Sequence, residues 1–225
     1  HISHSRMGPG DHHCDPGMEA IATKKLRDRH DLVIVQEKLD GSNVAIAKVN
    51  GVVIALGRKG YLAQTSPFDQ HKYFAWWVKQ QNGRFDELLN EGERVVGEWL
   101  IQAHGTKYNL HHEPFVPFDL MDGGTRLNYH TFLLRVLPFG FTVPRLIHLG
   151  QAIRLKSVLD KLEPSGHGAV DLVEGAVWRV ERKEIVDFLV KYVRPEKTDG
   201  KYLPEISGSE PVWNVDDSFL KSLKP

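Results

Sequence analysis

Apolar and polar positions along the chain predict strands first and helices later. The apolar run LVIVQEKL begins at residue 32, the alternating run NVAIAKV begins at residue 43, and GVVIAL follows directly after Asn50. An Asn-Gly pair between two such runs is a strong hairpin signal. The pattern therefore predicts a meander of antiparallel strands over residues 32–56.

Between residues 69 and 92 the apolar side chains recur at spacings of three and four, as at Phe74, Trp77, Phe85 and Leu88. This spacing predicts helices with one buried stripe, whose aromatic side chains belong to the core. Strands and helices then interleave without regular alternation, which predicts an α+β fold with antiparallel sheets flanked by helices, not a doubly wound parallel sheet. The further predicted strands are 94–101, 113–122, 141–149, 174–182 and 184–194, and the further predicted helices are 129–136 and 151–162.

The first 17 residues have no helical or strand periodicity and hold four of the 12 histidines. We expect a flexible tail over residues 1–17 and a single domain over residues 18–225. By residue type, His12, His13 and Cys14 could bind zinc, but no second ligand pair with the usual spacing lies nearby. A loose tail is therefore the favoured interpretation of this segment.

Composition limits the classes of function. The 225 residues include 29 Lys+Arg and 29 Asp+Glu, so the formal net charge is zero, which excludes strong non-specific binding to nucleic acid through a uniformly basic surface. No apolar run approaches the roughly 18 residues that a membrane span needs, and residues 1–17 contain no apolar segment of secretory type. The single cysteine, Cys14, excludes an internal disulfide. These features predict a protein of the cytoplasm with no membrane partner.

The segment EKLDGSN carries the strongest chemical signal. Lys38 stands where the first predicted strand ends, and Gly41 allows a tight turn before the next strand. A lysine that is partly desolvated and close to other cations can lose its proton and act as a nucleophile. Taken alone, the same residues also fit a surface lysine beside an Asp-Gly turn.

The sequence from Lys38 to Gly41 resembles motif I of the covalent nucleotidyltransferases, the superfamily of ATP-dependent DNA ligases, RNA ligases and mRNA capping enzymes. In that superfamily the motif I lysine accepts a nucleoside monophosphate. Arg58 stands where the superfamily has an arginine that contacts phosphate or the nucleic acid end. Glu98, in VVGEWL, resembles the motif IIIa glutamate that binds the ribose, and Phe118 resembles the motif III aromatic that stacks on the purine.

Two later residues continue the resemblance, which spans about residues 32 to 195. Glu174, in VEGAVWRV, matches the motif IV glutamate near the catalytic metal, and Lys191, in FLVKYVR, matches a motif V lysine on the α-phosphate. The resemblance thus implies Lys38, Glu174 and Lys191 as catalytic residues. It also implies ATP as cofactor, with AMP covalently on Lys38, and Mg²⁺ or Mn²⁺ held by Glu174 and Asp40.

Motif V departs from the superfamily pattern. The superfamily commonly has lysines two residues apart, whereas Val193 stands two residues after Lys191 and Arg194 follows it. Either Arg194 substitutes for the second lysine in binding the nucleotide, or the register is Leu189 and Lys191.

Within the superfamily, Glu37 and Asn43 around motif I resemble the RNA-ligase pattern. There the glutamate reads the adenine edge and the asparagine belongs to the metal and phosphate environment. AVWRVER and KYVRPEK resemble the RNA ligase 2-like branch. About 30 residues follow Arg194, too few for the oligonucleotide-binding (OB) barrel of DNA ligases and capping enzymes. We therefore expect an ATP-grasp-like ligase adenylation (nucleotidyltransferase) domain with no C-terminal OB barrel.

The resemblance implies an ATP-dependent RNA ligase that joins a 3'-hydroxyl to a 5'-phosphate during RNA repair. Its partners would be RNA ends or a nicked duplex, with or without an accessory protein or domain. Alternatives are a DNA ligase or capping-type guanylyltransferase domain acting with a partner, and an inactive protein that binds nucleic acid ends. The sequence does not decide the oligomeric state.

Three further segments allow two interpretations each. His104, in AHGTKY, and His167, in SGHGAV, are either loop residues or contacts to phosphate and ligand. The basic segment Lys24–His30 is either a solvated helix face or a guide for RNA phosphates.

Overall fold

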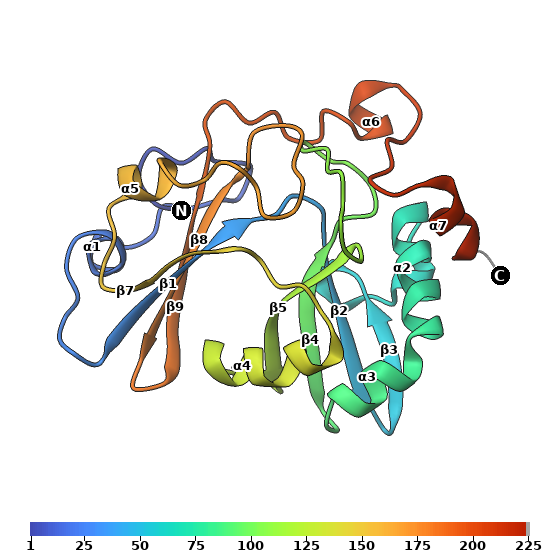
Figure 1. The fold of residues 1–225 in the computed structure, drawn as a ribbon, viewed down its shortest axis with the longest axis horizontal. Coiled ribbons are helices and arrows are strands. Elements are labelled where there is room, and N and C mark those ends of the chain that lie inside the picture. Colours follow the sequence, from blue (N-terminus) through green and yellow to red (C-terminus); the bar gives the residue numbers. More distant parts are fainter. Residues whose placement is uncertain (224–225) are drawn as a thin grey trace.

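Two antiparallel sheets lie side by side in the computed structural model, which describes residues 1–223 (Figure 1). The four-stranded sheet has the order β7-β1-β8-β9, and the five-stranded sheet has the order β3-β2-β4-β5-β6. The first comprises β1 (Asp31–Lys38), β7 (Leu146–Gly150), β8 (Gly175–Arg182) and β9 (Ile185–Val193). The second comprises β2 (Ser42–Val49), β3 (Val52–Leu56), β4 (Glu93–Trp99), β5 (Phe115–Asp122) and β6 (Thr125–Arg126).

Helices cover the outer sides of both sheets. In Figure 1, α2 (Asp69–Gln80), α3 (Asn82–Leu88) and α7 (Asp217–Ser222) lie beside the five-stranded sheet, and α1 (Pro16–Thr23) and α5 (Leu155–Leu159) lie beside the four-stranded one. The remaining helices are α4 (Tyr129–Val136), α6 (Pro204–Ser207) and the 3₁₀ turns η1 (Arg58–Gly60), η2 (Ala63–Thr65) and η3 (Leu137–Phe139). The predicted α+β class with antiparallel sheets is confirmed, and residues 1–223 form no closed barrel.

The hairpin predicted at Asn50 is present, but the predicted meander is wrong at its first strand. Asn50 and Gly51 both have positive φ, 51° and 72°, and join β2 to β3, as a two-residue hairpin turn requires. In contrast, β1 pairs with β7 and β8 and not with β2. The chain between β1 and β2 crosses from one sheet to the other.

Gly41 makes this crossing possible. A Cβ atom at residue 41 would lie 2.5 Å from the carbonyl oxygen of Trp99. Only glycine can approach that backbone so closely. The turn places the end of β1 against the neighbouring sheet, and it brings Lys38 to the boundary between the two sheets.

Each sheet has its own hydrophobic cluster. Phe74, Trp77 and Phe85, which the helical spacing predicts to be buried, pack with Phe115 of β5 in the larger cluster. The smaller cluster joins Val33 and other residues of the four-stranded sheet to α1 and α5. The larger cluster also includes Ile34 of β1, so it joins the two sheets beside the polar side chains that lie between them.

Some predicted elements are shorter in the structure. The predicted strand 141–149 begins only at Leu146, two residues after Pro144, which has no N–H to donate to a neighbouring strand. The predicted helix 151–162 contains only α5. Among residues 1–223, no helix combines the length and apolar character that crossing a bilayer needs.

The segment before α1 lies against β9. Ile2 is buried in the smaller cluster, and its backbone N–H donates to the carbonyl of Lys191 at 2.9 Å. Asp15 caps α1 by accepting from the N–H of Gly17, and the helix ends at Thr23, so the basic segment Lys24–His30 is not helical.

Candidate active site

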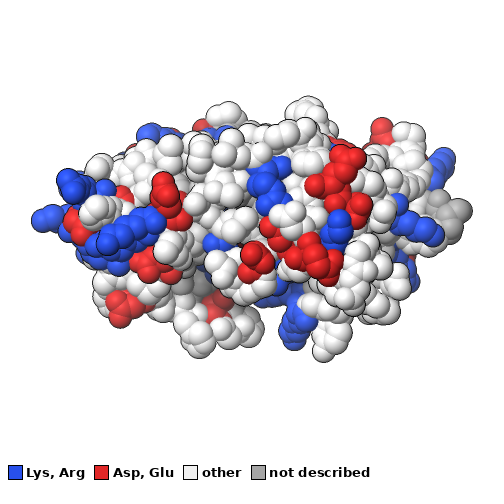
Figure 2. Space-filling model, turned by 90° about the horizontal axis from the view of Figure 1, so that it is seen from below, with Lys and Arg blue, Asp and Glu red and all other residues white. Residues whose placement is uncertain are grey.

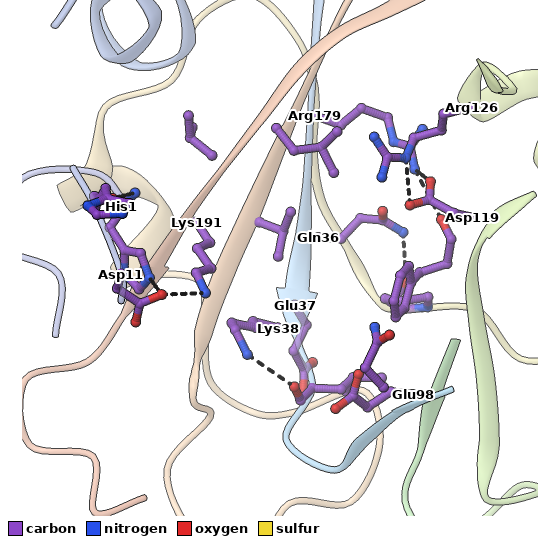
Figure 3. A pocket seen from close by; sticks show the side chains of 18 of the residues that line it. His1, Asp11, Gln36, Glu37, Lys38, Glu98, Asp119, Arg126, Arg179 and Lys191 are labelled. Carbon is purple, nitrogen blue, oxygen red and sulfur yellow. Dashed lines mark hydrogen bonds and ion pairs between the residues drawn. The ribbon is translucent and has the colours of Figure 1, made fainter. Parts of the chain in front are cut away.

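A cavity of about 550 Å³ opens between the two sheets, and a second hollow of about 670 Å³ adjoins it. Lys38, Asn43, Glu98 and Lys191 line both spaces, so the two are continuous around these residues. We call this the charged end of the cavity. The deep end of the cavity is lined by Gln36, Phe118, Asp119, Arg126, Pro144 and Arg179. Figure 3 shows the two ends, with Gln36 between them.

Lys38 is the last residue of β1 and lies at the charged end. Its Nζ donates to Glu174 Oε2 at 2.5 Å, and the lysine side chain is 21% exposed. Burial alone would lower the pKa of Lys38, but the carboxylates of Glu174 and Glu98 outweigh burial and raise that pKa above its usual value. In this state Lys38 is therefore an ammonium group held by carboxylates.

Glu174 lies directly before β8 and behind Lys38, and it lines neither space. Burial raises the pKa of Glu174, while the charge of Lys38 opposes that shift. The same cause acts on Glu98, whose pKa burial raises to about 7 against the opposing effect of Lys38. Two carboxyl groups thus share one lysine in a partly desolvated place, an arrangement common at functional sites.

Glu98 and Asn43 face each other across β4 and β2. Glu98 Oε1 also accepts from the backbone N–H of Gly41 at 2.9 Å, which fixes the glutamate against the turn after Lys38. The structure thus brings four sequence-predicted residues, Lys38, Gly41, Asn43 and Glu98, into one corner of the site.

Lys191 enters the site from β9, where it pairs in register with Val177 of β8. Its Nζ lies 3.4 Å from Asp11 Oδ1, the only ion pair of Lys191 among the described residues. Arg58, on η1, lines the adjoining hollow. The two cations that the sequence predicts for phosphate contacts therefore lie around the same opening.

A network of neutral polar groups lines the hollow beside Lys38. Gln70 Oε1 accepts from Ser42 Oγ at 2.9 Å and lies 2.9 Å from His104 Nε2. His71 Nε2 lies 3.1 Å from the same serine oxygen. Burial lowers the pKa of both histidines. Sequence analysis missed Gln70 and His71, because residues on a helix gave no motif signal.

Phe118 turns into the cavity because of a β-bulge. In the pairing of β4 with β5, Val96 faces Asp119 and Gly97 faces Pro117, so Phe118 is the extra residue. Bulges re-aim side chains beside active sites. Phe118 lines the deep end of the cavity, where a flat ring can lie against it.

An ion cluster closes the deep end. Asp119 is buried and accepts from the guanidinium groups of both Arg179 and Arg126, the latter at 2.8 Å. Arg179 also donates to the carbonyl of Phe118 at 3.1 Å and so holds the bulge. The sequence motifs assigned no role to these charged side chains, although Arg179 lies in the segment VEGAVWRV.

Glu37 borders the cavity, but protein groups already bind its carboxylate. The group accepts from Arg145 Nε at 2.9 Å, from Ser165 Oγ at 2.5 Å and from the N–H of Gly166 at 2.9 Å. Successive side chains of a strand point to opposite faces, and Lys38 occupies the cavity face. Glu37 therefore ties β1 to the loop around Ser165, and its oxygens are already engaged by the protein.

Asp40 and Arg194 also have protein partners. Asp40 Oδ2 accepts from Lys197 and from the N–H of Gly105 at 2.8 Å, and Lys197 lowers the pKa of Asp40 against the opposing effect of burial. Arg194 donates to the carbonyl of Val173 at 2.8 Å and to Glu163 at 2.9 Å, and it lines neither space. The structure therefore does not bring Arg194 to the nucleotide position that motif V predicts for it.

No three His, Cys, Asp or Glu side chains within residues 1–223 gather closely enough to form a metal cage. This holds for His12, His13 and Cys14, and also for Glu174 and Asp40. Carboxylate oxygens are nevertheless suitable ligands for Mg²⁺, which keeps several waters and binds through one or two carboxylates together with substrate phosphates. Glu98 lines both spaces, Asp40 lines the adjoining hollow and Glu174 contacts Lys38, so each offers carboxylate oxygens for that sparse type of site.

The basic segment Lys24–His30 lies away from the site. Figure 2 shows Lys and Arg gathered at the end of the molecule that carries the loop after α1. Arg27 in this loop is bound to Asp31 and Asp187. Across the rest of that face, both signs of charge are mixed (Figure 2).

Comparison with protein families agrees with the site. Residues 31–193 match the RNA ligase family, and the chain belongs to that family. The matched segment begins at the first residue of β1 and ends at the last residue of β9, so it contains Lys38, Glu98, Phe118, Glu174 and Lys191. A search of curated protein sequences found no match.

Solved structures share the fold. A Naegleria gruberi RNA ligase with pyrophosphate is 20% identical with a TM-score of 0.53, and covers 80% of this chain and 53% of its own. A variant of the Naegleria gruberi ligase with ATP and Mn is 17% identical, with a TM-score of 0.52 and coverage of 74% and 51%. An archaeal ATP-dependent RNA ligase is 20% identical, with a TM-score of 0.50 and coverage of 72% and 42%. The chain thus spans about half or less of the length of these proteins.

Proposed function

We propose that this chain is an ATP-dependent RNA ligase that acts through a covalent lysyl-AMP on Lys38. AMP would pass from Lys38 to a 5'-phosphate, and a 3'-hydroxyl would then displace AMP and join the ends, as in RNA repair. Membership of the RNA ligase family supports the reaction class. The position of Lys38 between a deep cavity and a group of cations carries the proposal.

The charged end fits the first step. Attack of the Lys38 amine on the α-phosphorus of ATP forms an N–P bond, and pyrophosphate leaves with the electrons of the broken P–O bond. Positioning and charge stabilisation dominate such phosphoryl transfers. Lys191 at the opening can neutralise a non-bridging oxygen of the α-phosphate, and Arg58 can bind the outer phosphates in the adjoining hollow.

Lys38 must lose a proton before it attacks, and its carboxylate partners hold it as an ammonium group in this state. Bound Mg²⁺ or Mn²⁺ would supply positive charge next to the α-phosphate and to Glu174. Less of the negative charge of Glu174 would then stabilise the ammonium form of Lys38, and the pKa of the amine would fall. Glu98 would orient the ribose beside it.

The deep end fits a base. Phe118 offers an aromatic face, and Val177 and Leu189 line the same cavity. A neutral purine needs such an apolar slot with few polar groups. The Naegleria gruberi structures named with ATP and Mn support the choice of nucleotide and metal for this chain.

Transfer of label from α-labelled ATP to the protein tests the proposal. The protein is incubated with Mg²⁺ and labelled ATP or GTP, denatured, and assayed for bound label. We expect label from ATP that is lost in Lys38→Ala and kept in Lys221→Ala, since Lys221 is exposed on α7. Label from GTP alone would indicate capping chemistry instead, and no label from either would indicate an end-binding protein.

Sealing of nicked duplexes tests the polymer. The labelled protein is given an RNA nick or a DNA nick of the same sequence with a 5'-phosphate and a 3'-hydroxyl. We expect joining of RNA with release of AMP, and little joining of DNA. Equal or better joining of DNA would contradict an RNA ligase.

A further inference from the structure

We propose that Gln36, and not Glu37, reads the purine edge and makes the site select adenine over guanine. The inference rests on the proposed nucleotide site and adds a residue that determines its specificity. No sequence motif includes Gln36, and its role follows from the alternation of β1 and from one hydrogen bond.

The alternation of β1 places Gln36 on the cavity face. Val33 and Val35 pack in the smaller hydrophobic cluster on the outer side of the four-stranded sheet, whereas Ile34 packs in the cluster of the opposite sheet. Side chains two residues apart share a face, so Ile34, Gln36 and Lys38 point the same way. Figure 3 shows Gln36 between Lys38 and the cluster around Arg179.

One hydrogen bond fixes which end of the Gln36 amide faces the cavity. Gln36 Nε2 donates to the carbonyl of Pro144 at 3.2 Å. Only the amide nitrogen can donate to a carbonyl, so the assignment of nitrogen and oxygen is determined. Among the described residues, no group donates to Gln36 Oε1. The glutamine is 6% exposed and lines the cavity, so its oxygen is an acceptor open to a ligand in the cavity.

An acceptor at this position distinguishes the two purines. Adenine carries an amino group at position 6, which donates, whereas guanine carries an oxygen there, which accepts. Guanine would place its oxygen against Gln36 Oε1 and leave both acceptors without a donor, and an unsatisfied buried polar group is costly. Gln36 cannot simply turn over, because Pro144 would then lose its donor.

The other polar side chains that could contact the base edge are already bound by protein groups. Glu37 borders the cavity, but its carboxylate already accepts from Arg145, Ser165 and the N–H of Gly166. At the deep end, Arg179 is bound to Asp119 and to the carbonyl of Phe118. Gln36 therefore presents the free acceptor that lies closest to Lys38 along the cavity face of β1.

The test compares nucleotides that differ at one position. Labelling of Lys38 is measured with ATP, with purine riboside triphosphate, which lacks the 6-amino group, and with inosine triphosphate, which carries a 6-oxygen. We expect the wild type to label from ATP at least about tenfold faster than from purine riboside triphosphate, and slowest from inosine triphosphate. In Gln36→Leu, we expect the rate of labelling from ATP to fall to the rate from purine riboside triphosphate. The rate from purine riboside triphosphate should stay at its wild-type value.

Glu37→Gln is the matched control, because it changes the adjacent residue on the opposite face. We expect the ratio of ATP to purine riboside triphosphate to keep its wild-type value in this variant. If the preference for ATP over purine riboside triphosphate were lost in Glu37→Gln but kept in Gln36→Leu, the inference would be overturned. Glu37 would then be the residue that contacts the purine edge.

Failure of the inference and failure of the proposed function give different results. If Lys38 is labelled equally by ATP and purine riboside triphosphate in the wild type, the inference is wrong and the ligase proposal stands. If no nucleotide labels Lys38, the proposed function itself is wrong, and the inference, which rests on it, is wrong as well. The comparison of ATP with purine riboside triphosphate in the wild type tests the inference even if Gln36→Leu does not fold.

Discussion

At the charged end of the cavity, Lys38 and Glu174 stand beside strand ends and form an ion pair next to Glu98, whereas at the deep end Asp119 and Arg179 come from strand interiors and neutralise each other. Lys38 ends β1 and Glu174 directly precedes β8. Arg179 and Asp119 lie within β8 and β5 and bind each other. On the proposed function, we expect the charged end to perform the chemistry and the deep end to hold the shape of the base site.

The largest expected effect tests the charged end. Lys191→Met removes the cation from β9 without shortening the side chain greatly. Since removal of one group that stabilises developing charge typically costs about 100- to 1000-fold, we expect labelling of Lys38 to slow by that amount, as measured from single-turnover rates with saturating ATP.

The matched control is Lys79→Met, which removes an exposed lysine from α2. It should leave the labelling rate unchanged. If Lys191→Met labels as fast as this control, then Lys191 does not contact the α-phosphate and the charged end contains fewer active groups than proposed.

The second prediction tests the rigidity of the deep end. Arg179→Met leaves Asp119 buried with only Arg126 as its partner, and breaking a buried ion pair from one side costs about 3 kcal/mol. We expect the free energy of unfolding to fall by about that amount in urea titrations.

Two comparisons decide whether the ion pair is the cause. Arg154→Met, at an exposed position before α5, should cost less than about 0.5 kcal/mol. The double variant Arg179→Met with Asp119→Leu should recover part of the loss, because it removes the uncompensated charge. No recovery would mean that packing around Arg179, and not its charge, stabilises the deep end.

The two ends also differ in what the sequence could predict. Lys38, Glu98, Glu174 and Lys191 lie far apart in the chain but within named motifs, and the structure brings them together at the end of β1. Arg194 and Glu37 are also in motifs, yet their side chains bind Glu163 and Arg145. A motif gives the residue type at a position but not the direction of its side chain.

The deep end depends on features that the motifs do not describe. Gln36 could have been found from the sequence, because it lies two residues before Lys38 on the same strand. The role of Phe118 depends on a bulge that places one extra residue in β5, and no local pattern marks that insertion. The pairing of β1 with β7 and β8 was missed for a related reason, since a strand order depends on partners more than 100 residues away.

The third prediction concerns stacking at the deep end. Phe118→Ala removes the aromatic face, and stacking of a base on an aromatic ring is worth about 1–3 kcal/mol. We expect the dissociation constant for ATP to rise about 10- to 100-fold in the Lys38→Ala background, which prevents covalent reaction, as measured by calorimetry.

Phe68→Ala serves as the control, because Phe68 is 48% exposed and lines only the adjoining hollow. It should change the affinity for ATP much less. A greater loss of ATP affinity in Phe68→Ala than in Phe118→Ala would indicate that the base lies in the hollow. The assignment of the two ends would then have to be reversed.

The smallest effect concerns the loop that holds Glu37 behind the deep end. His167 is buried, its Nδ1 lies 2.8 Å from His112 Nε2, and its Nε2 accepts from the N–H of Arg145. Burial lowers the pKa of His167 below its ordinary value of 6.5, so the folded state disfavours the protonated form. Stability from this group is therefore complete above pH 6.5 and is lost as the pH falls through the lowered pKa.

We expect the free energy of unfolding to decrease by about 1–2 kcal/mol below pH 6.5 through this histidine, as measured by urea titration at several pH values. In His167→Gln the decrease should become smaller by that amount, whereas His130→Gln, at an exposed position on α4, should keep it. A wild-type profile that His167→Gln leaves unchanged would show that other groups cause the acid sensitivity. If the nucleotide affinity also weakens on acidification in the wild type but not in His167→Gln, then the support of β1 by this loop reaches the deep end.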